Sequence, residues 1–272
     1  MMKRRWLRWV AGVLALAALA GGGWTARHRV LGNAVALLDL AECSGGPAAS
    51  QPPVDARLVA HAGGAVNGFT YTNTLDALNE SYRKGYRVFE VDFHWTSDGR
   101  LVLVHEWKET SISFGARPHV YSYEEFLHAR RVDGLRQMTF EELRGWLQAH
   151  RDALLVTDTK ASNPRLLRFL AAQAGDVRSQ LIVQVYRTTE IAPARRLGVR
   201  AVWLTVYRYA YPAWALGRIP SADAAVIPME WYPRYRQVIL SGKMRFYLHT
   251  VPAGAVEATF RELPGIYGLY VD

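Results

Sequence analysis

One stretch of this 272-residue chain reads Val88-Phe89-Glu90-Val91-Asp92-Phe93-His94-Trp95-Thr96-Ser97-Asp98-Gly99-Arg100-Leu101-Val102-Leu103-Val104-His105-Glu106-Trp107. It consists of two runs rich in β-branched and aromatic residues, joined at Asp98-Gly99. Two such runs around Asp-Gly predict a β-hairpin with a two-residue type I′ turn. Counting outward from that turn places Asp92 opposite His105 and Glu90 opposite Trp107. Paired residues, and residues two apart on one strand, share a face of the sheet. We therefore expect Glu90, Asp92 and His105 to converge on one side of the hairpin.

Two carboxylates facing an imidazole form a costly arrangement in a packed sheet. A charge that loses its water must be neutralised, protonated or given a metal. Carboxylate oxygens suit hard cations, so this face of the hairpin predicts a site for one divalent cation, Ca²⁺ or Mg²⁺. The alternative is an exposed face on which the charges are merely solvated.

The composition is that of a globular chain with a basic balance. Half of the residues are hydrophobic and 12% are aromatic, which allows a sizeable core and argues against disorder. The single cysteine, Cys43, excludes an intrachain disulfide framework. The formal net charge of +9 suits an anionic substrate or a phospholipid surface. We expect no nucleic acid as a partner, because no basic helix or aromatic-basic recognition motif stands out.

The first 24 residues have the character of a membrane or signal segment. Basic residues at Met1–Arg5 precede an apolar run, Trp6–Trp24, that is interrupted only by Arg8. The run approaches the roughly 20 residues that a bilayer requires, and the basic residues predict a cytoplasmic N-terminus with the body outside the membrane. Ala18-Leu19-Ala20 also fits a signal-peptidase site. We favour an uncleaved anchor with the body on the extracytoplasmic (periplasmic) side over export after cleavage.

Residues 25–55 are interpreted as a linker, because their second half is rich in Gly, Pro, Ala and Ser. Residues 56–272 form the predicted domain, in which apolar runs of strand length alternate with helical patterns. The strand candidates are Leu58–Ala60, Val88–Phe93, Leu101–His105, Leu154–Thr157, Leu181–Tyr186, Ala201–Val206, Ala224–Pro228, Phe246–Thr250 and Gly268–Val271. Eight or nine strands with helices between them, over roughly 215 residues, match an α/β fold of the (β/α)₈ TIM-barrel type.

Helix starts are marked between these strands. Asn73-Thr74 can cap a helix that runs to about Gly85. Ser122-x-x-Glu125 and Thr139-x-x-Glu142 are both capping boxes. Asn163-Pro164 offers an N-cap and a proline at the first helical position.

Functional groups of such a barrel lie at the C-terminal ends of its strands. The first strand ends in His61-Ala62-Gly63-Gly64, where glycine allows the backbone to approach a ligand. The strand 154–157 is followed by Asp158-Thr159-Lys160, again an i, i+2 pair on one face. Together with Glu90, Asp92 and His105, these residues predict a polar site at one rim of the barrel.

In the order of the chain, these motifs resemble the glycerophosphodiester phosphodiesterase family of the phosphatidylinositol-phospholipase-C-like barrels. The matching segments are His61-Ala62-Gly63, Thr72-Asn73-Thr74, Glu90-Val91-Asp92, Thr96-Ser97-Asp98-Gly99, His105-Glu106, Asp158-Thr159-Lys160 and Met138–Leu143, with Val251 and Tyr270-Val271-Asp272 near the end. Three positions depart from the family pattern. Ala62 replaces an arginine that would hold phosphate, Thr72 replaces a glutamate, and Asp158 replaces the usual metal-binding glutamate.

The resemblance implies a metal-dependent phosphodiester hydrolase acting on glycerol- or polyol-linked phosphodiesters. Glu90, Asp92 and Asp158 would hold one divalent cation, while His61 and His105 would act as general acid and base. In the family's route a neighbouring hydroxyl of the alcohol attacks first, and water then opens the cyclic phosphate. Lys160 would add positive charge to a phosphate oxygen, and the substrate would be an anionic phosphodiester.

Other residues at the same rim are weaker candidates. Glu230 and His249 follow later strands and are expected to line the substrate pocket, although His249 could equally be a satisfied polar residue. The aromatic series Tyr207, Tyr209, Tyr211 and Trp214 would form a lid or lipid-facing loop, or else pack in the core. Two other functions remain open: a catalytically silent barrel that binds phosphorylated lipid or glycan, and a phospholipase-type phosphotransferase that stops at the cyclic phosphate.

Overall fold

Strands form at all nine of the sequence runs that predicted them. The computed structural model describes residues 54–208, 211–216, 219 and 222–272, together with Ala34 and Leu38. Its strands are β1 (Leu58–Ala60), β2 (Val88–Trp95), β3 (Leu101–Leu103), β4 (Leu154–Thr159), β5 (Leu181–Val185), β6 (Ala201–Thr205), β7 (Ala224–Pro228), β8 (Arg245–Val251) and β9 (Gly268–Val271).

Eight of these strands close into a parallel barrel. They pair in the order β1-β9-β8-β7-β6-β5-β4-β2, and the pairing of Ala60 with Phe89 joins β1 to β2. The strand β3 pairs only with β2, antiparallel and outside the ring. The predicted TIM barrel is thus confirmed, with β3 as an addition to its second strand.

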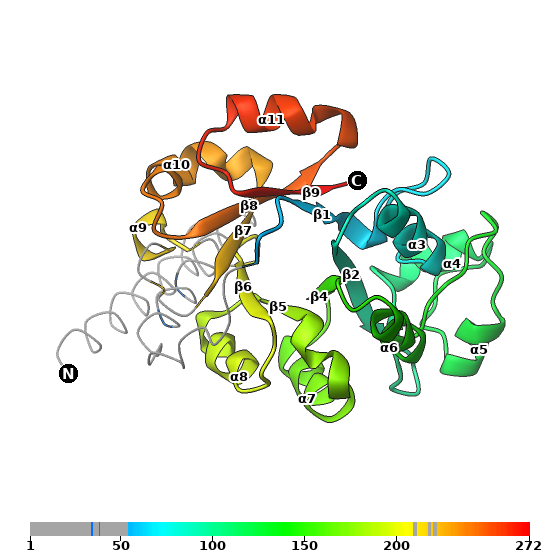
Figure 1. The fold of residues 1–272 in the computed structure, drawn as a ribbon. Helices are drawn as coiled ribbons and strands as arrows, with labels where there is room; N and C mark the ends of the chain where they lie inside the picture. The colour runs from blue at the N-terminus through cyan, green and yellow to red at the C-terminus, as the bar shows by residue number, and fades with distance from the viewer. Residues whose placement is uncertain (1–33, 35–37, 39–53, 209–210, 217–218, 220–221) are drawn as a thin grey trace, which may run out of the picture.

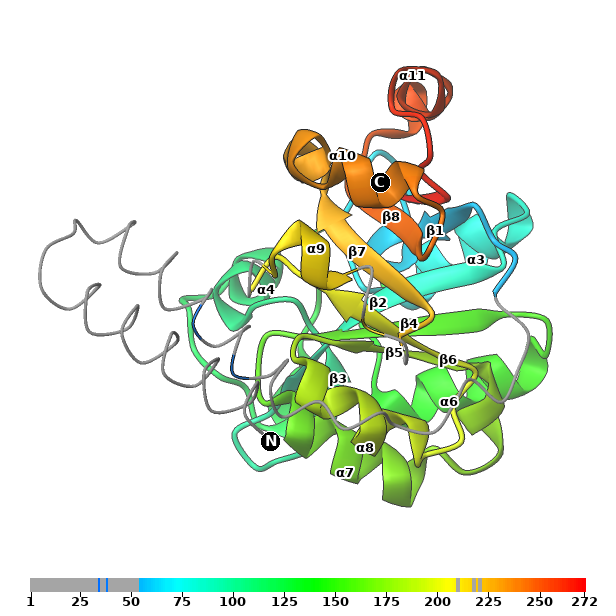
Figure 2. The same ribbon diagram turned by 90° about the vertical axis from the view of Figure 1, so that its left-hand side faces the viewer.

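Helices surround the strands on the outside (Figure 1). Those between barrel strands are α3 (Leu75–Arg83), α6 (Phe140–Ala149), α7 (Asn163–Gln173), α8 (Ile191–Arg195), α9 (Ala213–Leu216), α10 (Tyr232–Leu240) and α11 (Val256–Glu262). Two more, α4 (Trp107–Ser113) and α5 (Tyr123–His128), lie in the long excursion between β3 and α6. In Figure 2 the helices α4 and α9 lie toward the same end of the barrel.

Helix starts follow the sequence signals except at α7. Both capping boxes form, with Ser122 and Thr139 accepting from the N3 backbone and the N3 glutamates bonding back. The cap of α3 is Thr74, whose side chain accepts from Ala77 N. The predicted N-cap Asn163 is wrong, because α7 has Ser162 at its cap while the Asn163 amide donates to Glu190 Oε2 at 2.9 Å.

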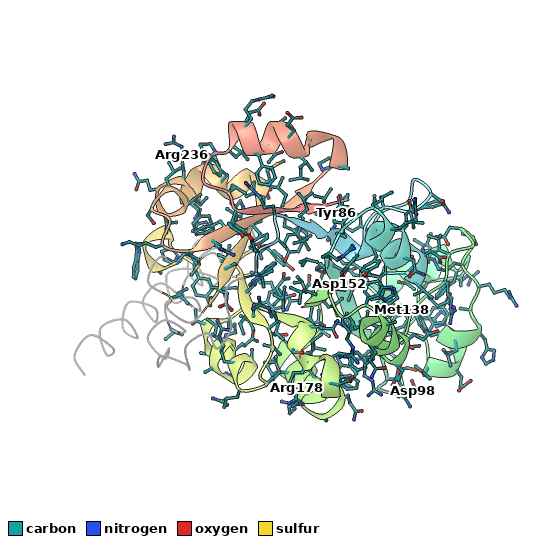
Figure 3. The ribbon with its side chains drawn as sticks, in the orientation of Figure 1. Tyr86, Asp98, Met138, Asp152, Arg178 and Arg236 are labelled. Carbon is teal, nitrogen blue, oxygen red and sulfur yellow. The ribbon has the colours of Figure 1, made fainter. Side chains whose placement is uncertain are left out.

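The predicted register of the hairpin is wrong by one residue. Phe93 pairs with Leu103, so Asp92 faces Val104 rather than His105, and Trp107 begins α4 rather than facing Glu90. Between Thr96 and Arg100 only Gly99 has a positive φ, +83°, whereas a type I′ turn needs two such residues. The Thr96 hydroxyl donates to Asp98 at 2.6 Å and accepts from Arg100 N at 2.8 Å, which stabilises a longer loop. Asp98 lies at the edge of the molecule (Figure 3).

The barrel interior is closed below the site by large rings. Trp203, Tyr247 and Tyr270 are almost fully buried in a cluster that also contains Val88 and Val156. A second, larger apolar cluster packs the outer faces of the strands against the helices. The interior therefore changes along β2 from Val88 in the apolar floor to Glu90 and Asp92 toward the C-terminal end, because alternate residues face inward.

The predicted membrane or signal segment, residues 1–24, lies outside the described residues, as does nearly all of the predicted linker. Within the described part, no helix has the length and apolar character needed to cross a bilayer.

We expect Thr139→Ala to lower the free energy of unfolding by about 1–2 kcal/mol, because it removes a cap that accepts from Glu142 N at 3.2 Å. Urea unfolding of the full-length chain measures this change. Ser162→Ala is the matched control, since Ser162 caps α7 without a side-chain hydrogen bond and should cost less than about 0.5 kcal/mol. Equal losses in the two variants would contradict the assignment.

Candidate active site

Three carboxylates meet at the C-terminal end of the barrel. Glu90 and Asp92 extend from β2, and Asp158 extends from the neighbouring strand β4, where it is in register with Asp92. One ligand oxygen from each lies within 4.8 Å of the others. All three residues are no more than 3% exposed, so the arrangement is not a solvated surface face. The predicted convergence of Glu90, Asp92 and Asp158 is what the structure shows.

The β2 carboxylates are held by backbone and amide groups. Glu90 Oε2 accepts from Ala62 N at 2.8 Å, but Glu90 Oε1 is buried and has no hydrogen-bond partner in the described part of the chain. Asn73 Nδ2 donates to Asp92 Oδ2 at 3.0 Å, and Asn73 Oδ1 accepts from Asp92 N at 2.8 Å. Asn73 adopts a positive φ, +51°, just before the cap of α3. Its two-way bond fixes the β2 end to the start of that helix.

Asp158 has the strongest set of donors. Its Oδ1 accepts from Thr159 N at 2.6 Å, and its Oδ2 accepts from both Lys160 Nζ and the Tyr207 hydroxyl at 2.8 Å. Lys160 Nζ also lies 3.6 Å from Asp92 Oδ1. The Lys160 ammonium therefore offsets part of the negative charge of both Asp158 and Asp92. The Tyr207 hydroxyl, which follows β6, is a further donor to Asp158.

The electrostatics separate the three acids. Burial, followed by the charges of Asp92 and Asp158, raises the pKa of Glu90 well above its usual value. Burial and the Asp158 charge also raise the pKa of Asp92. Burial acts in the same direction on Asp158, but Lys160 and the Tyr207 hydroxyl outweigh it and leave the pKa of Asp158 below the usual value. Burial lowers the pKa of Lys160, yet the nearby Asp158 and Asp92 raise it overall.

These residues fit a hard divalent cation. Three buried carboxylates carry more negative charge than the single nearby ammonium balances, and Glu90 Oε1 lacks a donor. A buried acceptor without a partner is what a cation with oxygen ligands would satisfy. Glu90, Asp92 and Asp158 would hold the ion.

His61 lies beside this cluster on the short 3₁₀ turn that follows β1. Its Nδ1 is 2.6 Å from Asp272 Oδ1, and its Nε2 is 3.8 Å from Glu90 Oε2. A carboxylate on Nδ1 holds that nitrogen protonated, so that Nε2 is the nitrogen that faces the site. The structure therefore directs the Nε2 edge of His61 toward the carboxylates.

His105 reaches the rim by another route than the predicted strand pairing. It follows β3, and its Nδ1 lies 2.8 Å from Glu109 Oε2 on α4. Its charge acts on Asp92 and lowers the pKa of that group, although desolvation has the larger, opposite effect. Tyr71 connects the two sides, since its ring centroid is 4.5 Å from that of His61 and 6.5 Å from that of His105.

His249 on β8 contacts the first histidine directly. The Nε2 atoms of His249 and His61 are 3.1 Å apart. Burial, followed by the charge of His61, lowers the pKa of His249 to about 3, so this ring is neutral at ordinary pH. The prediction that His249 belongs to this rim agrees with its position. His249 is therefore a neutral hydrogen-bond partner of His61 and adds no positive charge to the site.

Two predicted residues are placed differently. Glu230 is exposed after β7, and in the described residues no hydrogen bond or ion pair links it to the carboxylates. Gly63 has a φ of +85°, and a Cβ there would lie 3.2 Å from Ala77 Cβ, so packing of α3 already requires glycine at this position. Its role in approaching a ligand stays a prediction.

Ala62 and Thr72, two of the three positions that depart from the family pattern, are both buried. Ala62 is fully buried and has a φ of +48°, so its methyl group offers no charge to a phosphate. The Thr72 hydroxyl is 2.9 Å from that of Thr74 and does not reach the carboxylates.

Four residues contact the carboxylates or the histidines, although the sequence patterns predict no role at the site for them: Asn73, Glu109, Tyr207 and Asp272. Asn73 had a signal, but a helix cap explained it equally well. Glu109 and Asp272 act only through the two histidines, and Asp272 is 211 residues away from its partner. Tyr207 was considered as part of a lid, and Tyr209 of that series lies outside the described residues.

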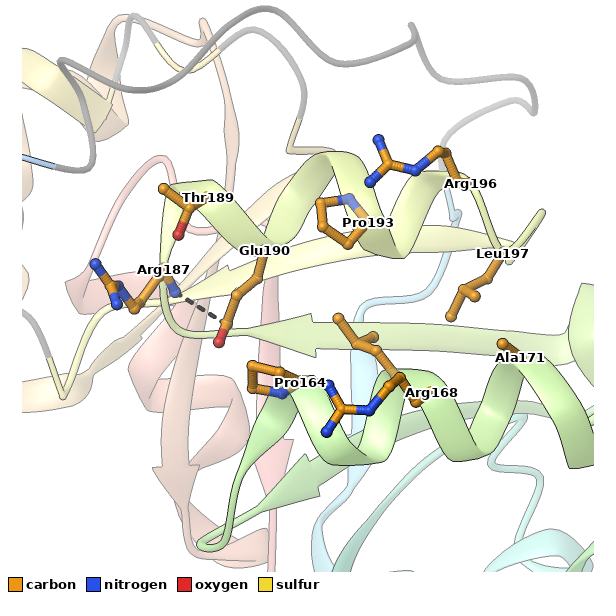
Figure 4. Close-up of a pocket in the computed structure, with 10 residues that line it drawn as sticks. Pro164, Arg168, Ala171, Arg187, Thr189, Glu190, Pro193, Arg196 and Leu197 are labelled. Atoms are coloured by element: carbon orange, nitrogen blue, oxygen red, sulfur yellow. Dashed lines mark hydrogen bonds between the residues drawn. The ribbon is translucent and has the colours of Figure 1, made fainter.

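One cavity does not coincide with this chemistry. It has a volume of about 450 Å³ and lies outside the barrel between α7 and α8, lined by residues such as Arg168, Pro193 and Leu197 (Figure 4). A smaller cavity of about 220 Å³ adjoins the site and is lined by Tyr71, Asn73 and His105. The position of the carboxylates and histidines identifies the smaller one as the space beside the chemistry.

Comparison with known proteins agrees with this site. Residues 61–177 match the model of the glycerophosphoryl diester phosphodiesterase family, a range that contains His61, Glu90, Asp92, His105 and Asp158. The match confirms the resemblance inferred from the motifs and the expected enzyme class, a phosphoric diester hydrolase.

Solved structures of low identity share the barrel. A glycerophosphodiester phosphodiesterase from Parabacteroides distasonis is 15% identical with a TM-score of 0.60, covering 81% of this chain and 94% of its own. The Thermotoga maritima enzyme is 15% identical with a TM-score of 0.59, covering 79% and 93%. An Oleispira antarctica phosphodiesterase, solved with its product sn-glycerol-3-phosphate, is 13% identical with a TM-score of 0.61, covering 79% and 92%. At these identities the likeness establishes the fold.

Without divalent cations, we expect Glu90→Gln to stabilise the protein relative to wild type, increasingly as pH rises above 4.5. The folded state raises the pKa of Glu90 above its ordinary 4.5, so the wild type loses stability as pH rises through the folded pKa. Urea unfolding in EDTA between pH 4.5 and pH 8 measures the difference.

Glu80→Gln is the control, because Arg83 and Lys84 lower the pKa of the partly exposed Glu80 and the sign of the stability change should reverse. A gap between Glu90→Gln and wild type that stays constant with pH would contradict the buried-charge account.

Proposed function

We propose that this protein hydrolyses glycerol- or polyol-linked phosphodiesters with one divalent cation, Ca²⁺ or Mg²⁺. The match of residues 61–177 to the glycerophosphoryl diester phosphodiesterase family model supports the proposal. Candidate substrates are glycerophosphodiesters, phospholipid headgroups and anionic envelope polymers. The catalytic groups would be His61 and His105, the cation ligands would be Glu90, Asp92 and Asp158, and Lys160 would contact the phosphate.

One observation supports this proposal above the others: both proposed catalytic histidines, His61 and His105, have a carboxylate on Nδ1. Asp272 lies 2.6 Å from His61, and Glu109 lies 2.8 Å from His105. A carboxylate in this position fixes the tautomer and stabilises the ring when it gains a proton at Nε2. A binding site for phosphate would need charge at this rim, but it would not need two rings oriented in this way.

The two rings supply the proton transfers that the reaction needs. In the first step one ring takes a proton at Nε2 from the neighbouring hydroxyl of the alcohol, and the other gives its Nε2 proton to the oxygen that leaves phosphorus. In the second step the roles are exchanged: the ring that lost its proton takes one from the attacking water, and the ring that gained a proton returns it to the alcohol oxygen that leaves as the cyclic phosphate opens. Both rings are then back in their initial states and no net proton is consumed.

The remaining residues place charge around the phosphate. A bound cation would supply Lewis acidity toward a phosphate oxygen. Lys160 lies between Asp158 and Asp92, where its ammonium would also face that oxygen. The Tyr207 hydroxyl keeps Asp158 in place by donating to it at 2.8 Å. Lys160 would thus supply the positive charge toward the phosphate that Ala62, in place of the family's arginine, cannot supply.

The location of the protein is a proposal as well. The basic residues and apolar run at the N-terminus support an anchored body on the extracytoplasmic side, or export after cleavage. Phospholipid headgroups and envelope polymers would both be within reach there.

The alternative function is a barrel that binds phosphorylated lipid or glycan without turnover. The buried methyl group of Ala62 favours it, since no guanidinium is present where the family has one. Both histidine–carboxylate pairs oppose it. An enzyme that stops at the cyclic phosphate would retain the first step only.

We expect the full-length chain to release phosphomonoester from glycerophosphodiesters and from bis(p-nitrophenyl) phosphate in the presence of Ca²⁺ or Mg²⁺. The second substrate has no neighbouring hydroxyl, so water would attack its phosphorus directly. EDTA or Asp92→Asn should reduce the rate to the background, because the cation ligands are lost. Chromogenic and phosphate-coupled assays measure the release. Accumulation of a cyclic phosphate would indicate the phosphotransferase instead.

Replacing either catalytic histidine should distinguish an enzyme from a binder. We expect His61→Ala and His105→Ala each to lower kcat by about 10²–10⁴-fold, while the cation-induced rise in Tm is retained. His128→Ala is the matched control, because that histidine is exposed on α5 and should keep full activity. If no variant or wild type turned over substrate while the cation still raised Tm, the binding function would replace the hydrolase.

A further inference from the structure

Four exposed apolar side chains lie on two connections beside the 220 Å³ cavity. Phe69 and Tyr71 follow β1, and Ile112 and Val132 lie in the excursion between β3 and α6. They are among nine large apolar residues that are exposed in the part of the chain that the structure describes, and another of these, Leu240, lies at the end of α10. Single exposed apolar residues are ordinary, but a group of four beside a site calls for an explanation.

Phe69 and Val132 are held in place by backbone hydrogen bonds. Phe69 is presented by a tight turn in which Asn67 and Gly68 have φ of +50° and +80°, and Val66 and Phe69 exchange both backbone hydrogen bonds. Val132 is 74% exposed, and its N–H donates at 2.8 Å to the carbonyl of Ser113. It therefore lies next to the end of α4, which carries Ile112 at 61% exposure. We call Phe69, Tyr71, Ile112 and Val132 the mouth rim.

The mouth rim is continuous with the active site. Tyr71 is 44% exposed, and its ring touches that of His61 at a centroid distance of 4.5 Å. It also lines the 220 Å³ cavity together with His105 and Ser113, the residue that bonds to Val132. An object that covers the rim therefore also covers the entrance to the histidines.

Because the mouth rim borders the active site, its position favours one kind of binding partner over another. A protein seated on the rim would close the entrance, whereas a lipid surface would bring phosphodiester headgroups to it. The net charge of +9 complements acidic phospholipids. The 53 residues that precede the described domain begin with the basic cluster and apolar run that predict a membrane segment, so a bilayer would be within reach of the barrel.

We propose that the mouth rim docks on a phospholipid bilayer containing acidic lipid and that the enzyme takes its phosphodiester headgroup directly from that surface. The inference rests on the proposed function and narrows its substrate to phosphodiesters of intact membrane lipids. Phe69, Ile112 and Val132 enter the boundary between headgroups and acyl chains, while Tyr71 lies between that boundary and His61.

A fluorescent probe at the rim tests the docking. Cys43 is replaced by Ser, acrylodan is attached to Ile112→Cys or Leu240→Cys, and each full-length chain is reconstituted into vesicles of equal phosphatidylcholine and phosphatidylglycerol. We expect the probe at 112 to shift its emission to shorter wavelength and to be quenched by brominated lipid. The probe at 240 should be quenched by aqueous iodide instead. Iodide quenching at 112 equal to that at 240 would overturn the proposal, and so would protection at 112 without quenching by lipid, which indicates a protein contact.

Activity separates docking from chemistry. The triple variant Phe69→Ser, Ile112→Ser, Val132→Ser should hydrolyse vesicle phospholipid at least about tenfold more slowly than wild type, because apolar burial at the boundary is lost. Its kcat/KM for soluble bis(p-nitrophenyl) phosphate should stay within about twofold, because these side chains do not contact the histidines. Leu240→Ser should match wild type on both substrates. An unchanged rate of the triple variant on vesicles would overturn the inference.

The two proposals fail in different ways. If wild type hydrolysed neither substrate, the proposed function would fall, together with the substrate assignment drawn from it, while the probe at 112 would still decide whether the rim meets lipid. If it hydrolysed only the soluble diester, the function would stand and the inference would fall.

Discussion

The mutual repulsion of three buried carboxylates is the constraint around which this rim is arranged. Glu90 and Asp92 on β2 face Asp158 on β4 because those strands pair in parallel register. The groups packed around the three acids are donors: the Ala62 N–H, the Asn73 amide, Lys160 and the Tyr207 hydroxyl. They do not satisfy Glu90 Oε1, and the pKa of Glu90 remains high because of burial. Three carboxylates and one ammonium leave two negative charges without a counter-charge, which suits a divalent cation.

The two proposed catalytic histidines lie beside the carboxylate cluster, and a further carboxylate orients each of them. His61 and His105 come from different connections, yet each has a carboxylate on Nδ1 and lies near the ring of Tyr71. His249 is held neutral by burial and by the charge of His61. The rim thus grades from buried acids, through oriented imidazoles, to exposed apolar side chains on the loops. That gradient matches a substrate with an anionic phosphodiester and an apolar remainder.

Period-two and helical patterns predicted all nine strands and both capping boxes, because those depend on neighbours in the chain. Glu90, Asp92 and Asp158 were predictable since alternate residues at a strand end share a face. The turn type at Asp98-Gly99 was not, because the Thr96 hydroxyl competes for the backbone of that loop. The type I′ geometry occurs instead at Asn67-Gly68. Asp272 could not be found from local pattern, since only closure of the barrel between β9 and β1 brings it to His61.

Occupancy of the carboxylate cluster tests the central claim most directly. Crystals of the full-length protein soaked in Mn²⁺ should give one anomalous difference peak between Glu90, Asp92 and Asp158, with carboxylate oxygens at roughly 2.0–2.6 Å. Lys160 Nζ should move away from Asp158 or share it with the ion. The absence of a peak at saturating Mn²⁺, with Lys160 still 2.8 Å from Asp158 Oδ2, would contradict the account and leave the cluster as an internal ion-pair network.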